Sequence, residues 1–243
     1  MTTQTVIRLF ADGPPGIGLE KLPIDPADFQ TAPTEQTWHV YFEDKALNLA
    51  VGIWTTTDMQ EPFGPYPGDE FMVVLKGRVE MMNADGTATP VETGQGFGVR
   101  NGVPLSWKQT GFLKKAFILM SYDESKAADG QGVFVAPSEA DALPLQDAED
   151  QIGGGEQREA AIYKNDTGNM EAGIWESSAF NTDLSPFSVH EFAHIIEGAV
   201  TITDQDGNSQ RFEAGESLFT PAGTVCSWAS DGPVRKFYAI VTP

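Results

Sequence analysis

Two histidines and a glutamate stand close together in the last quarter of the chain, at His190, Glu191 and His194. Their spacing matches H-E-x-x-H, the zinc-peptidase motif in which two histidines bind the metal and the glutamate activates a water molecule. This chemistry requires a helix, because only the 3.6-residue period places positions i and i+4 side by side.

The residues around this motif predict a strand instead of a helix. Pro186 stands just upstream, Gly198 ends the run, and residues 199–207 have the pattern of a β-hairpin arm that leads into an Asp-Gly turn. In a strand, residues four apart lie about 13 Å from each other, at about 3.3 Å per residue, so the two imidazoles cannot grip one ion. We therefore expect both histidines on the strand face opposite Glu191, and no peptidase site.

The chain repeats itself with an offset of 121 residues, as from residue 52 to residue 173. The matched residues are Gly52-Ile53-Trp54 with Gly173-Ile174-Trp175, Glu70-Phe71 with Glu191-Phe192, Gly77 with Gly198, Ser106-Trp107 with Ser227-Trp228, and Lys115 with Lys236. No gap is needed, so the pattern indicates a tandem duplication of one domain. The first copy keeps the glutamate but has Asp69 and Val73 where the second has its two histidines.

The length of the chain fits two such copies. With 243 residues, 26.3 kDa and 40% hydrophobic residues, it is long enough for two domains of about 120 residues that each bury a core. We expect an N-terminal domain with an extended arm at residues 1–125, and a linker with the C-terminal domain at residues 126–243.

The charge of the chain bears on its partners. A formal net charge of −20 and a pI near 4.3 oppose binding to nucleic acid or to an anionic membrane. The single cysteine excludes an intramolecular disulfide framework. We find no apolar run of signal-peptide or membrane-span length, and we expect a cytoplasmic protein.

Short β segments dominate the pattern. Residues 1–40 are rich in proline and glycine and predict an extended arm with one short helical turn. The segments that follow in the first copy are Trp38–Phe42, Leu47–Thr57, Glu70–Leu75, Arg78–Met82, Phe97–Val99 and Leu113–Tyr122. With no long amphipathic helix, this spacing predicts an all-β barrel or sandwich. In the linker, residues 138–143 could form one helical turn capped by Ser138.

The two copies resemble cupins. Glu70-x6-Gly77 and Glu191-x6-Gly198 look like the second half of the first cupin motif, and Gly215-x5-Pro221-Ala222-Gly223 resembles the second. The chain is similar to a bicupin, most of all to the group with ethanolamine-utilisation Q-like and ureidoglycine aminohydrolase-like proteins. The resemblance implies two tandem jelly-roll barrels and, by analogy with other cupins, a homodimer.

The departures from the cupin pattern concern the metal ligands. Cupin enzymes hold a divalent metal with two histidines and the glutamate of the first motif and one histidine of the second. The corresponding positions here are Phe63, Gly64, Pro65, Tyr66 and Leu105 in the first copy, and Leu184, Ser185, Pro186, Phe187 and Cys226 in the second. One carboxylate and at most one thiol fall short of the ligands that such metals need. We expect no metal and no cofactor in either barrel, and the aminohydrolase ligand set has no match.

Strand alternation predicts what faces each barrel interior. Glu70, Met72 and Val74 should share a face with Leu105 and Trp107, and the same holds for their counterparts in the second copy. The predicted pocket residues are Tyr66, Glu70, Met72, Leu105, Trp107, Phe187, Glu191, Ala193, Cys226 and Trp228. Each glutamate could orient a small polar ligand or act as an acid or base, or it could hydrogen-bond inside the barrel, for instance to Tyr66.

Other candidate residues have simpler interpretations. Trp54 and Trp175 recur in both copies, which favours core packing over a ligand platform. Cys226 replaces a histidine and is interpreted as a small apolar filler, because no histidine is placed to activate it as a nucleophile. His39 has no second ligand near it in the sequence.

Three functions remain open. We favour a metal-free bicupin that binds a small polar metabolite in one or both barrels. The second is an aminohydrolase- or isomerase-like enzyme that uses Glu70 or Glu191 as acid or base, with or without an unusual metal. The third is a structural or regulatory bicupin whose barrels are plugged by side chains.

Overall fold

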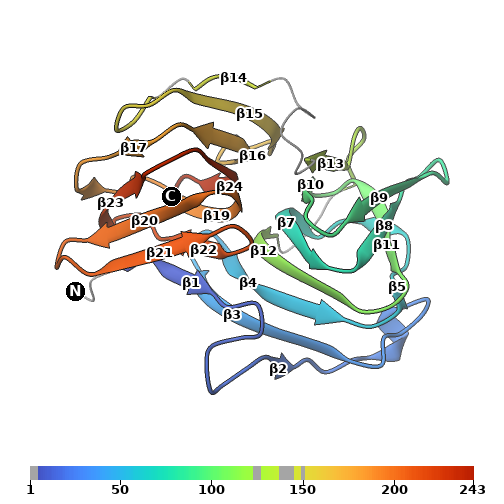
Figure 1. The fold of residues 1–243 in the computed structure, drawn as a ribbon. Coiled ribbons are helices and arrows are strands. Elements are labelled where there is room, and N and C mark those ends of the chain that lie inside the picture. Colours follow the sequence, from blue (N-terminus) through green and yellow to red (C-terminus); the bar gives the residue numbers. More distant parts are fainter. Residues whose placement is uncertain (1–4, 123–126, 137–144, 149–150) are drawn as a thin grey trace. The chain divides into compact units, whose positions relative to one another are not determined.

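The computed structural model describes residues 5–122, 127–136, 145–148 and 151–243. The chain divides into two compact units, each built of two antiparallel sheets. The N-terminal unit contains the described residues of 9–137, and the C-terminal unit contains those of 1–8 and 138–243. Figure 1 shows the strands of both units.

The N-terminal unit pairs a seven-stranded sheet with a shorter one. The larger sheet has the order β13 (Val133–Ala136), β10 (Gly96–Val99), β7 (Gly68–Lys76), β12 (Leu113–Ser121), β4 (Leu49–Thr56), β3 (Gln36–Asp44) and β2 (Glu20–Lys21). The opposing sheet has the order β5 (Met59–Gln60), β11 (Pro104–Gln109), β8 (Arg78–Met82) and β9 (Ala88–Glu92), and β6 (Gly64–Pro65) also pairs with β11.

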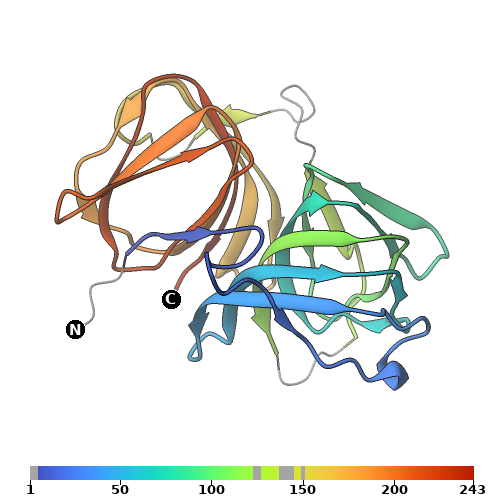
Figure 2. The ribbon, with the colours of Figure 1, turned by 60° about the horizontal axis from the view of Figure 1, so that its bottom comes forward.

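The C-terminal unit repeats this arrangement. Its larger sheet has the order β1 (Ile7–Leu9), β22 (Ser217–Thr220), β19 (His190–Glu197), β24 (Val234–Val241), β16 (Met170–Ser177), β15 (Gln157–Lys164) and β14 (Gln146–Asp147). The opposing sheet has the order β17 (Phe180–Asn181), β23 (Val225–Ser230), β20 (Ala199–Asp204) and β21 (Ser209–Glu213), and β18 (Ser185–Pro186) also pairs with β23. In Figure 2 these orange and red strands curve around a shared interior. The predicted all-β fold of two tandem barrels is confirmed.

The strand at one edge of the larger sheet comes from a different part of the chain in each unit. In the N-terminal unit β13 pairs with β10, with Gly96 opposite Ala136. In the C-terminal unit the same place beside β22 is taken by β1, from the start of the chain, and Figure 2 shows this blue strand next to the orange ones. In this division β13, which follows residue 125, belongs to the N-terminal unit and β1 to the C-terminal unit. The domain boundary after residue 125 stays a prediction.

Each hairpin that follows the glutamate strand turns at a glycine with a positive φ. Gly77 has φ +92° and Gly198 has φ +75°. A Cβ atom would lie 2.3 Å from the carbonyl oxygen of Phe112 at Gly77, and 2.1 Å from that of Pro233 at Gly198. Both the left-handed backbone and the close approach of a neighbouring strand require glycine, which explains why the residue recurs in the two copies.

The two sheets of each unit enclose an apolar core. In the N-terminal unit the core includes Met72, Val74, Leu105 and Trp107, and in the C-terminal unit it includes the counterparts Ala193, Ile195, Cys226 and Trp228. These are the residues that strand alternation predicted to share one face, so that prediction is confirmed.

Helical structure is short in the described residues. The turn expected in the N-terminal arm is a 3-10 helix, Pro26–Asp28, in which Asp25 caps the backbone N–H of Ala27. The turn expected at residues 138–143 lies outside the described residues. Within the described ranges, no helix has the length and apolarity needed to cross a membrane.

Candidate functional site

The H-E-x-x-H segment is extended backbone in β19, as predicted. His190 and His194 are both buried, and the core of the barrel contains their neighbours Ala193 and Ile195 on the opposite strand face. The two imidazoles have separate partners: His190 Nδ1 accepts from the Ala222 backbone N–H at 3.2 Å, and His194 Nδ1 lies 2.8 Å from Ser217 Oγ. Because the segment is a strand, the zinc-peptidase interpretation does not apply.

Burial changes the acid–base behaviour of His194. The side chain lies away from water, which lowers the pKa of its imidazole from 6.5 to about 4. The ring is therefore neutral at pH 7 and serves as a packed, hydrogen-bonded side chain on β19.

The glutamate of the N-terminal barrel is held by two partners. Lys115 Nζ on β12 lies 2.8 Å from Glu70 Oε1, and the Tyr66 hydroxyl donates to Glu70 Oε2. The ammonium group also touches Met72 Sδ at 2.9 Å. Glu70 and Lys115 are both buried, so each offsets the cost of burying the other's charge.

Aromatic rings enclose the Lys115 ammonium group. Its Nζ lies 5.1 Å from the ring centre of Trp54 and 4.9 Å from that of Trp107, distances at which a cation is attracted to an aromatic face. The indole N–H of Trp107 donates to Gln109 Oε1 at 3.0 Å. The polar atoms of this interior are thus satisfied by other side chains.

A second carboxyl group, Glu61, lies near this cluster. Burial raises its pKa from 4.5 to about 7, and the charge of Glu70 adds to the rise while Lys115 opposes it. Burial and the same two carboxylates also raise the pKa of the Tyr66 hydroxyl well above 10, so the phenol stays protonated and can donate to Glu70.

The C-terminal barrel repeats the ion pair. Lys236 Nζ on β24 binds Glu191 Oε1, and it lies 4.9 Å from the ring centre of Trp175 and 4.6 Å from that of Trp228. Lys236 and Glu191 are 8% and 6% exposed. A buried carboxylate–ammonium pair between two tryptophans is therefore common to both copies.

The surroundings of this pair are different in the C-terminal barrel, which contains a pocket of about 430 Å³ beside it. Its walls are Ile152, Gly153, Trp175, Phe180, Thr182, Asp183, Ser185, Pro186, Phe187, Ser188, Val189, Glu191, Cys226, Trp228 and Lys236. Three substitutions between the copies reduce side-chain volume or polarity here: Met72 becomes Ala193, Leu105 becomes Cys226, and Tyr66 becomes Phe187. Loss of the methionine, which covers the lysine in the first barrel, leaves Lys236 facing the pocket.

Polar atoms of the C-terminal barrel lack the partners that their counterparts have. Within the described part of the chain, Glu191 accepts a hydrogen bond only on Oε1, because Phe187 has no hydroxyl to donate to Oε2. The indole N–H of Trp228 has no acceptor among the described residues. In the first barrel the Trp107 indole N–H donates to Gln109. The residue that corresponds to Gln109 in the second barrel is Ser230, which donates to the Gly232 carbonyl instead.

The thiol of Cys226 lies in the same wall. Burial raises its pKa, and the nearby charge of Glu191 adds to the rise. A thiol that stays protonated is a poor nucleophile. This agrees with its interpretation as a small filler whose size helps to open the pocket.

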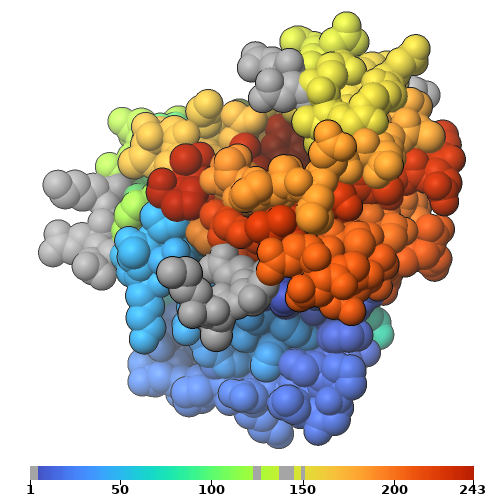
Figure 3. Space-filling model, turned by 90° about the vertical axis from the view of Figure 1, so that its left-hand side faces the viewer, coloured from blue at the N-terminus to red at the C-terminus, as the bar shows by residue number. Residues whose placement is uncertain are grey.

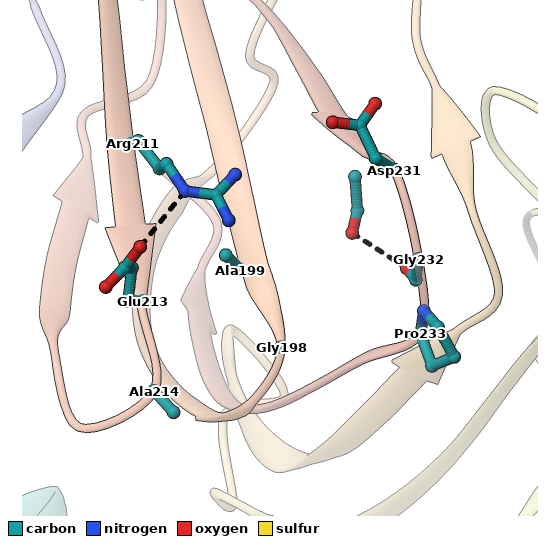
Figure 4. A pocket seen from close by; sticks show the side chains of 9 residues that line it. Gly198, Ala199, Arg211, Glu213, Ala214, Asp231, Gly232 and Pro233 are labelled. Atoms are coloured by element: carbon teal, nitrogen blue, oxygen red, sulfur yellow. Dashed lines mark hydrogen bonds and ion pairs between the residues drawn. The ribbon is translucent and has the colours of Figure 1, made fainter.

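Another recess lies on the surface of the C-terminal unit, between the β20–β21 strands and the turn before β24. Figure 4 shows its lining, in which Arg211 pairs with Glu213 at 3.1 Å and Ser230 donates to the Gly232 carbonyl. Figure 3 shows the neighbouring hairpin residues, in orange, on the surface of the molecule. Arg211 and Glu213 are exposed and paired with each other, so this recess has the features of a solvated surface and is a weaker candidate.

The residues at the cupin metal position do not fit a divalent cation. The glutamate oxygen that would bind the metal already binds a lysine ammonium group in each barrel, and a second cation beside it would be repelled. Within residues 5–122, 127–136, 145–148 and 151–243, no three histidine, cysteine, aspartate or glutamate side chains gather as a metal site would require.

Comparison with known proteins supports this architecture. Residues 164–238 match the EutQ-like cupin domain. A protein of unknown function of the DUF861 family from Pseudomonas syringae pv. tomato is 22% identical, with a TM-score of 0.78 over 98% of this chain and 100% of the other. The whole chain has the bicupin fold.

Two further solved structures resemble the bicupin over most of its length. The protein Ylba from E. coli, also of the DUF861 family, is 12% identical, with a TM-score of 0.61 over 99% of this chain and 92% of the other. A cupin 2 conserved barrel domain protein from Leptotrichia buccalis is 12% identical, with a TM-score of 0.63 over 92% of this chain and 98% of the other. At these identities the likeness concerns the fold. No curated protein sequence matches the bicupin.

The predicted pocket residues fall into two groups in the bicupin. Tyr66, Glu70, Met72, Leu105 and Trp107 gather in the filled N-terminal interior. Phe187, Glu191, Cys226 and Trp228 line the C-terminal pocket, and Ala193 packs in the same core. Sequence reasoning missed Glu61 and the partners Lys115 and Lys236, although the recurrence of a lysine at the same offset was a usable signal.

Proposed function

We propose that the C-terminal barrel binds a small polar metabolite with an apolar portion, whereas the N-terminal barrel is plugged and has a structural role. The observation that carries this proposal is the pocket of about 430 Å³ beside Glu191 and Lys236, where the other copy places Met72 against its lysine. Pockets of this size, mostly apolar with a few converging polar groups, are typical of small-molecule sites.

The chemistry of the pocket restricts the ligand. The charges of Glu191 and Lys236 neutralise each other, so a ligand with a net charge would lose hydration without gaining a free counter-ion. A hydrogen-bond acceptor would satisfy the Trp228 indole N–H, and a donor would satisfy Glu191 Oε2. The rings of Trp175, Phe180 and Phe187 provide the apolar wall. We therefore expect a ligand without net charge that offers both kinds of group.

A thermal-shift screen tests the proposal. The panel contains small amides, alcohols, aldehydes, ureides, carboxylates, amines and sugars, and a true ligand at about 100 times its Kd stabilises the native state by about 2.7 kcal/mol. The matched control is Ala193→Met, which introduces beside Lys236 the side chain that Met72 places against Lys115 in the other barrel, and which removes no polar group. We expect ligands to shift the wild type but not this variant.

Two outcomes would count against binding in this pocket. One is a panel that leaves the melting temperature of the wild type unchanged, and the other is an equal shift of the wild type and Ala193→Met. Glu191→Gln separates binding from acid–base catalysis, because an amide still accepts and donates hydrogen bonds but cannot exchange a proton at neutral pH. A cytoplasmic location and a homodimer stay predictions from the sequence.

A further inference from the structure

We propose that Lys236 is a reactive amine, whose Nζ forms a reversible iminium bond with a small aldehyde or ketone bound in the C-terminal pocket. This inference rests on the proposed function, since the carbonyl compound must first occupy the pocket. It adds a covalent step and a chemical class of ligand, an uncharged carbonyl compound whose oxygen can accept from the Trp228 indole N–H.

The position of Lys236 supports reaction with a bound molecule. The residue is 8% exposed and lines the pocket, so its amine is accessible from the pocket more than from bulk water. Trp175 and Trp228 hold the nitrogen between them at 4.9 and 4.6 Å from their ring centres. Fixing an amine beside a bound carbonyl group removes much of the entropic cost of their encounter.

The other copy provides a contrast within the same chain. Lys115 has the same carboxylate partner and the same two tryptophans, but Met72 Sδ lies 2.9 Å from its Nζ and Tyr66 bonds to the second oxygen of Glu70. The side of the amine that faces the pocket in Lys236 is covered in Lys115. The two lysines therefore differ in access, although each has a carboxylate partner and two tryptophan rings.

The step balances with the groups present. The Lys236 ammonium passes one proton to Glu191, and the neutral amine adds to the carbonyl carbon, where the new C–N bond forms as the C=O π electrons move to oxygen. A proton moves from nitrogen to that oxygen and gives a carbinolamine. Glu191 then returns its proton to the hydroxyl group, the C–O bond breaks, and water leaves with the carbonyl oxygen. The iminium nitrogen keeps one proton and the positive charge, and no oxidant or reductant is needed.

The electrostatics of the site suit this product. An iminium ion carries its positive charge where the ammonium group carried it, next to the Glu191 carboxylate and between two indole faces. The interactions that stabilise the ammonium group therefore also stabilise the product. Glu191 is in contact with the nitrogen and can act as the general base and acid of the two proton transfers.

Reductive trapping tests the inference. The full-length protein is incubated with benzaldehyde and sodium cyanoborohydride, which reduces an iminium ion to a stable benzylamine, and the modified lysines are located by peptide mass spectrometry. We expect Lys236 to carry the benzyl group well before Lys115 and before Lys21, whose side chain is 82% exposed. Ala193→Met should slow the modification of Lys236 at least tenfold, and Glu191→Gln should slow it by about 10²-fold.

The design separates failure of the covalent step from failure of binding. Benzyl alcohol has nearly the same shape as benzaldehyde but cannot form an iminium bond, so it reports on the pocket alone. Stabilisation of the wild type by benzyl alcohol, without preferential labelling of Lys236, would overturn the iminium inference and leave the binding proposal standing. If neither compound stabilises the protein and labelling follows side-chain exposure, with Lys21 first, both are overturned.

Discussion

The two barrels share a buried charge pair and differ in what surrounds it. In both, the motif glutamate binds a lysine that two tryptophans flank. In the N-terminal barrel Met72 and Tyr66 complete the shell around Glu70 and Lys115. In the C-terminal barrel their counterparts are alanine and phenylalanine, and a pocket lies there instead. The ion pair therefore belongs to the scaffold that both copies share, whereas the residues next to it determine whether a pocket lies beside it.

Removal of the lysines should have the largest effect on stability, and the effect should differ between the two barrels. Lys236→Met leaves Glu191 buried without a partner, and we expect a loss of about 3–5 kcal/mol in unfolding free energy. Lys115→Met should cost less, because Tyr66 still donates to Glu70. Chemical denaturation of both variants measures the difference.

The double variant Glu191→Gln/Lys236→Met provides the control for this measurement. It removes the unpaired Glu191 carboxylate, so it should recover part of the stability that Lys236→Met loses. An equal loss in Lys236→Met and Lys115→Met would show that Tyr66 contributes nothing to the shell around Glu70.

Exchange of the residues at positions 72 and 193 should convert one barrel toward the other. Met72→Ala removes a fully buried side chain from the core and should cost about 2–5 kcal/mol. Ala193→Met adds volume beside Lys236 at a fully buried position, so we expect it to cost about 1–3 kcal/mol, less than Met72→Ala. Calorimetry gives both values, and a larger loss in Ala193→Met than in Met72→Ala would contradict the filled and open descriptions.

The pH dependence of stability should have opposite signs in the two units. The folded state raises the pKa of Glu61 from 4.5 to about 7, so it binds a proton more tightly than the unfolded state, and this group's contribution to stability falls as pH rises through that window. Folding lowers the pKa of His194 from 6.5 to about 4, so stability there falls as pH drops from 6.5 to 4. Each effect has an upper bound of about 3 kcal/mol.

Difference curves from two variants measure these slopes. Glu61→Gln should remove the loss of stability between pH 4.5 and 7, and His194→Gln should remove the loss between pH 6.5 and 4. Unfolding free energies across this range, compared with the wild type, test each sign separately. A Glu61→Gln difference curve that is flat would show that this carboxyl group titrates normally in the folded protein.

Changes to the hydrogen-bond acceptor of the tryptophan indole N–H should have the smallest effect on stability. Gln109→Ser should leave the Trp107 indole N–H without an acceptor, as that of Trp228 is in the C-terminal barrel. We expect this to cost about 1–3 kcal/mol. Ser230→Gln should supply an acceptor for Trp228 and stabilise the protein by about 1 kcal/mol in the absence of ligand. If this variant also binds ligand more weakly, the indole N–H takes part in binding; unchanged affinity would exclude that role.

Much of the fold could be predicted from the sequence, because period-2 alternation and the constant offset between copies are local signals that tertiary packing does not override. The same signals placed Glu70 beside Tyr66 and Glu191 beside Cys226 on interior faces. They could not identify Lys115 and Lys236 as partners, because a lysine on a strand is expected to face water and its carboxylate lies 45 residues away in sequence.

Other features depended on the fold in three dimensions. Glu61 lies outside regular alternation, in a segment between β5 and β6, so nothing local indicates its burial or its raised pKa. The pocket of the second barrel is related to the change from Met72 to Ala193. The sequence could not show this, because it does not indicate that a lysine lies against that position.

The strand at the start of the chain has a consequence for biosynthesis. Arg8 on β1 binds Glu216 beside β22, a contact that spans 208 residues, so β1 is synthesised well before the strand that it pairs with. Until then the growing chain exposes the unpaired edge of β22 or of β1, the kind of edge on which polypeptides aggregate. A C-terminal fragment that lacks residues 5–9 would leave the edge of β22 unpaired. We expect this fragment to aggregate unless residues 5–9 are added as a peptide.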